Sequence, residues 1–235
     1  MTLCSIIIPV YNSAEGMPRL VAELEHWLPK LGADYEVLLV NDGSRDGSWQ
    51  AISEVVRTRP WLRGINLMRN YGQHNALLCG IRAVRGDVIV TMDDDLQNPP
   101  SEIPVMLAKL NEGFDVVYGK PRKERHGLLR DAASRVTKLA LQSAMGAETA
   151  RNVSAFRAFR AHLRDAFATY QSPYLSIDVL LTWATTRFAA IEVKHDERQY
   201  GVSQYTLGKL VNHAFNMMTG FSTGPLRLEI GRAHV

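Results

Sequence analysis

The first half of the chain alternates short apolar runs with amphipathic segments. Between these runs, apolar residues recur every three or four positions, which predicts helices near 18–31, 47–58 and 73–84. The runs themselves are rich in β-branched residues and predict buried strands at 5–10, 36–40, 62–67 and 87–92. Strands and helices that alternate with short turns predict an α/β fold with a mostly parallel central sheet and helices on both faces.

The second half has a less regular pattern. It predicts an amphipathic helix within 120–140, a strand near 153–159, helices near 161–169 and 176–186, a strand at 188–193, and a last helix near 206–219. The sequence contains no internal repeat and no linker rich in Pro, Gly or Ser. We therefore assign residues 1–228 to one domain.

Polar residues follow three of the predicted strands directly. Tyr11 and Asn12 follow the first strand, Asn41 and Asp42 the second, and the triplet 93–95 the fourth. Ligands of open parallel sheets bind beyond the carboxyl ends of the strands. The sequence therefore predicts that these side chains form one binding site.

The triplet of aspartates at 93–95 carries the most chemical information. Carboxylates within about 5 Å of one another repel by roughly 3 kcal/mol per pair at an effective dielectric constant near 20. A divalent cation such as Mg²⁺ or Mn²⁺, which prefers hard oxygen ligands, relieves this repulsion. Two alternatives remain open: acids that decorate the start of the helix opened by Pro99, and the strand-end aspartates of phosphoryl-transfer proteins.

Composition and charge narrow the class of protein. The chain has 235 residues, of which 46% are hydrophobic and 22% charged, as in a single globular domain. No apolar run reaches the roughly 18 residues that a membrane-spanning helix needs. The two cysteines, Cys4 and Cys79, lie far apart in sequence and are expected to be reduced thiols.

Basic residues concentrate between residues 120 and 138. Seven basic and two acidic side chains give this segment a net charge of +5, against +3 for the whole chain. Such a segment suits phosphate groups or an anionic membrane surface, although a solvated helix face is an equally simple interpretation.

An ordered series of motifs resembles the family 2 glycosyltransferases of the GT-A fold. These motifs are SIIIPVYN at 5–12, NDGS at 41–44 and DDDLQ at 93–97. Three further motifs are similar to those of polyprenyl-phosphate glycosyltransferases of the dolichyl-phosphate mannose synthase and undecaprenyl-phosphate aminoarabinose transferase types: RNYGQH at 69–74, DLQNPP at 95–100 and ERQYGVSQY at 197–205. The resemblance spans about residues 5–228 and, as an ordered series, is specific.

The resemblance implies an inverting transfer of a sugar from a nucleotide diphosphate donor, above all a UDP-sugar, to a polyprenyl phosphate. It implies Mg²⁺ or Mn²⁺ as cofactor, with Asp93, Asp95 and Gln97 as metal ligands. The residues implied to hold the nucleotide sugar are Pro9, Tyr11, Asn12, Asp42, Asp93, Asp94 and Lys209.

The remaining implied roles concern the reaction and the acceptor. Arg198 would neutralise the departing diphosphate together with the metal at Asp95. The residues implied to meet the acceptor phosphate are Arg122, Arg130 and Arg135. Asp178 is either a general base, needed if the acceptor is a hydroxyl group, or a buried salt-bridge partner, which we favour slightly.

Two other functions remain open, namely a family 2 transferase acting on a sugar hydroxyl and a silent module that only binds nucleotide sugars. We expect no nucleic-acid partner, and self-association into a homo-oligomer is left open.

A lipid acceptor implies that the protein acts at the cytoplasmic face of the membrane. We expect residues 206–228 to form an interfacial or juxtamembrane region. The tail 229–235 looks like a translated sequencing adapter, so we expect the natural chain to continue into membrane-spanning segments.

Overall fold

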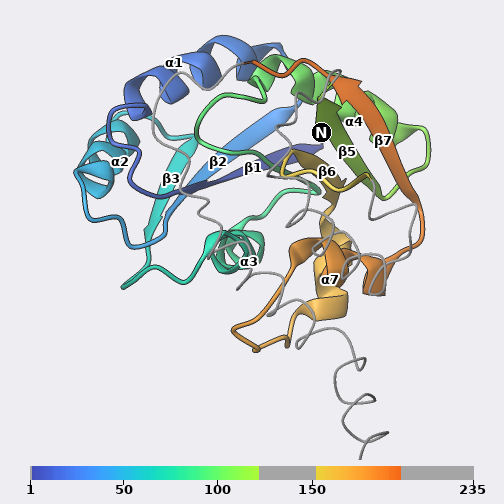
Figure 1. Cartoon of the computed structure of the whole chain (residues 1–235). Helices are drawn as coiled ribbons and strands as arrows, with labels where there is room; N and C mark the ends of the chain where they lie inside the picture. Colours follow the sequence, from blue (N-terminus) through green and yellow to red (C-terminus); the bar gives the residue numbers. More distant parts are fainter. Residues whose placement is uncertain (1, 122–151, 197–235) are drawn as a thin grey trace, which may run out of the picture.

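The computed structural model describes residues 2–121 and 152–196, which form a layered α/β structure (Figure 1). In these residues one sheet has the strand order β3-β2-β1-β4-β6-β5-β7. The strands are β1 (Leu3–Val10), β2 (Asp34–Asn41), β3 (Leu62–Asn66), β4 (Val88–Thr91), β5 (Val116–Pro121), β6 (Arg157–Arg160) and β7 (Phe188–Val193). The α-helices are α1 (Met17–Trp27), α2 (Ser48–Val56), α3 (Gln73–Ala83), α4 (Ile103–Asn111) and α7 (Ile177–Ala184). Short 3₁₀ helices occupy Leu28–Lys30, Pro100–Glu102 and Ala161–Phe167.

The sheet is mostly parallel, as the sequence predicted. Strand β1 pairs in parallel with β2 and β4, β2 with β3, and β5 with β7. Strand β6 runs antiparallel to both of its neighbours, β4 and β5. It starts at the edge of the sheet where β4 and β5 end, since Arg157 pairs with Thr91 and with Tyr118.

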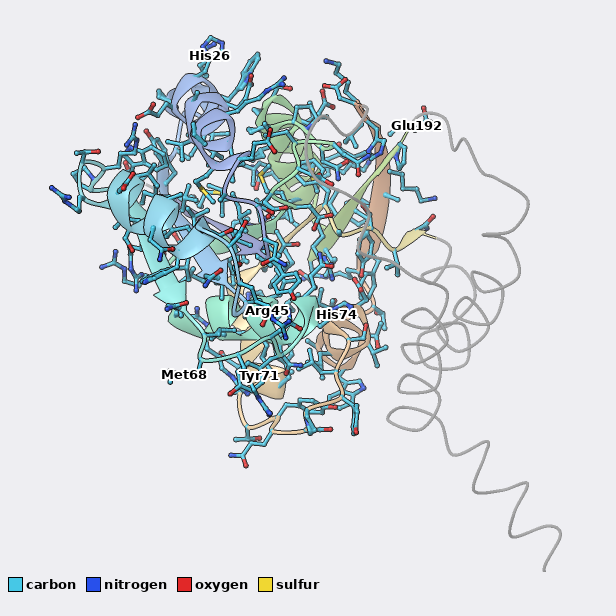
Figure 2. All side chains as sticks on the ribbon, turned by 60° about the vertical axis from the view of Figure 1, so that its left-hand side comes forward. His26, Arg45, Met68, Tyr71, His74 and Glu192 are labelled. Carbon is cyan, nitrogen blue, oxygen red and sulfur yellow. The ribbon has the colours of Figure 1, made fainter. Side chains whose placement is uncertain are left out.

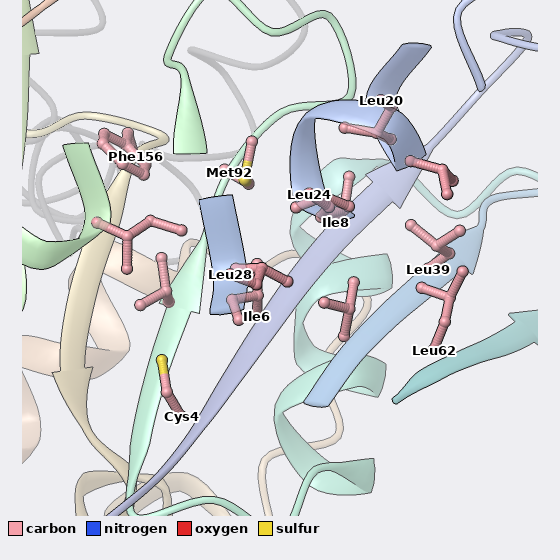
Figure 3. Packing of buried hydrophobic residues seen from close by; sticks show 14 of the residues in the cluster. Cys4, Ile6, Ile8, Leu20, Leu24, Leu28, Leu39, Leu62, Met92 and Phe156 are labelled. Carbon is pink, nitrogen blue, oxygen red and sulfur yellow. The ribbon is translucent and has the colours of Figure 1, made fainter. Parts of the chain in front are cut away.

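Both faces of the central strands are buried. On one face Ile6 and Ile8 of β1 pack with Leu20 and Leu24 of α1 and with Met92 (Figure 3). On the other face Ile7 belongs to a cluster that includes residues of α3 and α7. A strand covered on both sides is mostly apolar, which explains the nearly continuous hydrophobic runs.

Two predictions from the sequence were incomplete or wrong. Strand β5 was missed, because Gly119 and Pro121 interrupt its short apolar run. The segment predicted as a helix at 161–169 is a 3₁₀ helix, Ala161–Phe167. Tertiary contacts hold it there, because Arg164 donates hydrogen bonds from Nη1 to the carbonyl oxygens of Ile81 and Val84 at the end of α3. No helix in the described part of the chain is long and apolar enough to span a bilayer.

A buried carboxylate joins the strands at the edge opposite their carboxyl ends. Glu36 is 5% exposed and accepts hydrogen bonds from Ser5 Oγ and the Arg85 backbone N–H, each at 2.7 Å. The guanidinium groups of Arg63 and Arg85 each lie 3.3 Å from Glu36 Oε2. Burial raises the pKa of this carboxyl, but the hydrogen bonds from Arg85 and Ser5 and the charge of Arg85 outweigh it and leave the pKa lowered.

We predict that Glu36→Gln lowers the free energy of unfolding by about 1–3 kcal/mol at pH 7, the scale of a buried hydrogen-bonded charge. A lowered pKa in the folded state means that this stabilisation is present above the unfolded pKa of about 4.3 and is lost as pH falls through the folded value. Urea unfolding at neutral and acidic pH measures it, with Glu54→Gln on the exposed side of α2 as the control. A difference between Glu36→Gln and wild type that does not shrink at acidic pH would contradict the assignment.

Candidate active site

The polar ends of three adjacent strands meet at one edge of the sheet, as the sequence predicted. In the register Val10 pairs with Asn41, and Ile7 pairs with Thr91. The Asp42 N–H donates to the Val10 carbonyl oxygen at 2.9 Å, just beyond the last paired residues. Because β1 lies between β2 and β4, residues 11–12, 41–42 and 93–95 share this edge.

A chain of polar contacts fixes the turns at this edge. Asn12 has a φ of 52°, and its N–H donates to Ser44 Oγ at 2.9 Å. Asn12 Oδ1 in turn accepts the Arg45 N–H at 2.8 Å. Ser44 Oγ donates to Asn41 Oδ1 at 2.5 Å, and Asn41 Nδ2 donates to Asn66 Oδ1 at 2.7 Å. Side-chain hydrogen bonds therefore connect the ends of β1, β2 and β3. The sequence showed that these residues are polar, but not which of them are partners.

Asp42 holds the segment that precedes α3. It is 3% exposed, and its carboxylate oxygens accept the backbone N–H groups of Tyr71 at 2.7 Å and Gly72 at 2.9 Å. Burial raises the pKa of Asp42, and these two hydrogen bonds oppose that rise. Asn70 Nδ2 also donates to the Asp42 carbonyl oxygen at 3.2 Å. Asp42 thus fixes the 71–72 segment, which forms one wall of the candidate site.

Gly43 allows the close approach of these two segments. It has a φ of +64°, and a Cβ built on it would lie 2.3 Å from the backbone carbon of Arg69. Such a distance is far shorter than a carbon–carbon contact, so the strand end and the 69–72 segment meet backbone to backbone only because residue 43 is glycine.

The acidic triplet lies half-buried at the end of β4. Asp93 Oδ1 accepts a hydrogen bond from Gln73 Nε2 at 2.6 Å. Asp95 Oδ1 accepts the Gln97 N–H at 3.1 Å across a turn in which Leu96 has a φ of 58°. Asp94 is also half-buried. The turn joins the Asp95 side chain to the backbone of Gln97, so two of the three predicted metal ligands belong to one turn.

Sequence reasoning missed His195, which lies against this turn. Its Nδ1 is 3.2 Å from Asn98 Oδ1, and its Nε2 is 3.5 Å from Gln97 Nε2. The neighbouring Asp196 N–H donates to the Gln97 carbonyl oxygen at 2.8 Å. Its only signal in the sequence was its place just past the carboxyl end of a predicted strand, the position at which site residues gather in such sheets.

The oxygens at this edge suit a cation that also binds substrate. Within the described residues, no three or more His, Cys, Asp or Glu side chains converge as a complete metal site. Mg²⁺ and cations like it are commonly held by one or two carboxylates together with substrate phosphates. The half-buried oxygens of Asp93, Asp95 and Gln97 fit that mode of binding.

Asp178 is part of a buried ion pair. It is 3% exposed, and its Oδ1 accepts hydrogen bonds from Arg157 Nη1 at 2.6 Å and from Tyr118 Oη at 3.0 Å. Burial, followed by the negative charge of Asp178, raises the pKa of Tyr118 far above its ordinary value, so its hydroxyl stays a donor. This geometry favours the salt-bridge interpretation over that of a general base, which needs access to the acceptor.

The other predicted site residues divide into two groups. Pro9 and Tyr11 lie half-buried at the end of β1, beside Asn12. The residues and segments that lie outside the described part of the chain are Arg122, Arg130, Arg135, Arg198, Lys209, the region 206–228 and the tail 229–235.

Comparison with known proteins defines the class first. Residues 5–168 match the protein family described as Glycosyl transferase family 2. The chain belongs to this glycosyltransferase family, and its fold is the GT-A fold.

Individual relatives narrow the comparison. The chain is 39% identical over 225 residues to the undecaprenyl-phosphate 4-deoxy-4-formamido-L-arabinose transferase of Enterobacter sp. (strain 638), covering 95% of this chain and 69% of the relative. The protein of the same name from Aeromonas hydrophila is 37% identical, with 96% and 70% covered. Among solved structures, a glucosyl-3-phosphoglycerate synthase from Mycobacterium tuberculosis with Mn²⁺, UDP-glucose and phosphoglyceric acid superposes with a TM-score of 0.66 at 17% identity, over 93% of this chain and 79% of that one.

We predict that Gly43→Ala lowers the free energy of unfolding by more than about 3 kcal/mol, because backbone atoms have to move. Gly32→Ala is the matched control: Gly32 has a similar φ of +66° but nothing within 4 Å of the added Cβ. That variant should cost only the roughly 1–2 kcal/mol of the left-handed conformation. Urea unfolding of both variants measures the difference, and equal losses would show that the contact with Arg69 is unimportant.

Proposed function

We propose that this chain transfers a sugar from a nucleotide diphosphate sugar, a UDP-sugar in the first instance, to undecaprenyl phosphate or a similar polyprenyl phosphate, with inversion at the anomeric carbon. The observation that carries the proposal is the 36–39% identity, over 95–96% of this chain, to relatives named as undecaprenyl-phosphate transferases. The site geometry agrees with that chemistry on both the donor and the acceptor side.

The donor side is the edge formed by β1, β2 and β4. Asp42 holds the wall at Tyr71 and Gly72, where we place the nucleoside, and Asp93 lies between that wall and the turn of Asp95. A structural neighbour was crystallised with Mn²⁺ and UDP-glucose. We therefore propose Asp93, Asp95 and Gln97 as ligands of Mg²⁺ or Mn²⁺, with Pro9, Tyr11, Asn12, Asp94 and Lys209 around the nucleotide sugar.

The departing diphosphate needs its developing charge stabilised. A cation bound at these oxygens supplies Lewis-acid stabilisation of that charge. We propose that Arg198, five residues after the end of β7, faces the same phosphates. Preorganised positive charge is the main source of catalysis in such a site. The segment that leads to it is anchored to the acidic turn by the bond from the Asp196 N–H to the Gln97 carbonyl oxygen.

The acceptor side favours a phosphate over a hydroxyl group. A phosphomonoester has a second pKa of about 6, so near neutral pH it is already mostly a dianion and needs no base. The candidate base, Asp178, is bound to Arg157 and Tyr118 and is almost fully buried, which would serve a hydroxyl acceptor poorly. We propose that Arg122, Arg130 and Arg135 position the acceptor phosphate.

A polyprenyl acceptor lies in a bilayer, so we propose that the enzyme works at the cytoplasmic face of the membrane. The basic segment 120–138, with its net charge of +5, suits both the acceptor phosphate and an anionic lipid surface. In this proposal residues 1–228 are the catalytic domain and 206–228 contact the interface.

We predict that Asp95→Ala abolishes sugar transfer without changing the midpoint of thermal unfolding, because it removes a metal ligand from a half-buried turn. Excess chelator should do the same to the wild-type protein, and added Mg²⁺ or Mn²⁺ should restore activity. The matched control is Asp34→Ala, an exposed aspartate at the opposite edge of the sheet. The assay is transfer from a panel of nucleotide sugars to undecaprenyl phosphate, and full activity in excess chelator would contradict the metal-dependent reaction.

We predict that Arg122→Ala and Arg130→Ala each weaken use of the acceptor by roughly 1.5–3 kcal/mol, the scale of a charged hydrogen bond, with little change in donor binding. Asp178→Asn should lower stability rather than the turnover of the folded enzyme. The control is Arg57→Ala, which changes an exposed arginine directly after α2. If instead Asp178→Asn stops turnover at unchanged stability and neither arginine matters, the acceptor is a sugar hydroxyl.

A further inference from the structure

Gln73 makes a side-chain contact that the roles discussed so far do not use. It is the first residue of α3 and follows Gly72, whose φ is 92°. Its Nε2 donates to Asp93 Oδ1 at 2.6 Å. The contact joins the start of α3 to the end of β4, twenty residues further along the chain.

The residues before and after Gln73 are both anchored by hydrogen bonds. The two preceding N–H groups, of Tyr71 and Gly72, donate to Asp42. On the following residue, His74 Nδ1 accepts the Ile177 N–H at 3.3 Å, which ties α3 to the start of α7. Tyr71 and His74, the labelled neighbours of Gln73, can be followed in Figure 2. With its neighbours anchored, the Gln73 side chain starts from a fixed point, and its amide can fix the orientation of Asp93.

The chemical type of this side chain suits a carboxylate that has to bind a cation. A lysine in its place would hold Asp93 equally well, but its charge would compete with the cation. A glutamate would repel Asp93. A neutral amide donates a hydrogen bond to Asp93 without bringing a charge of its own.

We propose that Gln73 is a positioning residue that orients the Asp93 carboxylate for the cation and the nucleoside diphosphate. This inference rests on the proposed function, in which Asp93 faces both. Without the amide, Asp93 loses a contact that orients it, so the loss should fall on the donor and its cation and spare the acceptor.

The test measures binding of UDP with Mn²⁺ by calorimetry, together with donor and acceptor KM. Gln73→Met keeps the length of the side chain but removes the donor, and it should weaken binding and raise the donor KM about tenfold, the scale of one charge-assisted hydrogen bond. The acceptor KM should stay within about twofold of wild type. Gln73→Lys restores a donor but adds charge, so its affinity for Mn²⁺ with UDP should be at least as weak as that of Gln73→Met.

The matched control is Asn75→Ala, which removes an exposed amide from the same turn of α3 whose partners are the carbonyl oxygens of Tyr71 and Pro173. It should bind as wild type does, and thermal unfolding shows that each variant is folded. Wild-type affinity in Gln73→Met would overturn the inference, and so would full recovery in Gln73→Lys, which would indicate a purely structural anchor. If the wild-type protein itself binds no nucleoside diphosphate with Mn²⁺, the proposed function fails instead.

Discussion

The parallel pairing of β1 with β2 on one side and β4 on the other is the constraint on which the rest of the structure depends. Covering both faces makes the central positions of these strands apolar, and most of their polar side chains lie toward the ends of the strands. Because the strands are parallel, their carboxyl ends lie at one edge, and the residues that follow them have to share it. The site is thus a direct consequence of how the sheet is buried.

Five of the carboxylates around this sheet differ in the partners that the structure gives them. Glu36, Asp115 and Asp178 face arginines, which neutralise them and make them structural. Asp42 and Asp93 instead accept hydrogen bonds from neutral amides, of the backbone and of Gln73 respectively. An amide orders a carboxylate without cancelling its charge, which is the condition for binding a cation or a nucleotide. Burial alone does not distinguish the two kinds of carboxylate, since Asp42 and Asp178 are each 3% exposed.

The ion pair of Asp178 also matters for the kind of acceptor that the enzyme can use. A glycosyltransferase that acts on a hydroxyl group needs a base with access to the acceptor, whereas a phosphate arrives already ionised. The engagement of Asp178 with Arg157 and Tyr118 is compatible with the second case. The proposed lipid-phosphate acceptor rests on the relatives named as undecaprenyl-phosphate transferases, and the buried ion pair of Arg157 and Asp178 is compatible with it.

The sequence by itself determined the strands β1 to β4, the helices between them, and the place of Asp42 and the acidic triplet at the ends of the strands. It could do so because the spacing of apolar residues within one element shows which faces of that element are buried. It also determined the family, through the order of its motifs. Only the tertiary structure decided which partner each polar side chain meets: Gln73 for Asp93, His195 for Asn98, and Arg157 for Asp178. It also decided the direction of β6 and the existence of β5. These contacts join residues 20 to 97 positions apart, and they depend on how the chain crosses the sheet, which no local pattern of residues encodes.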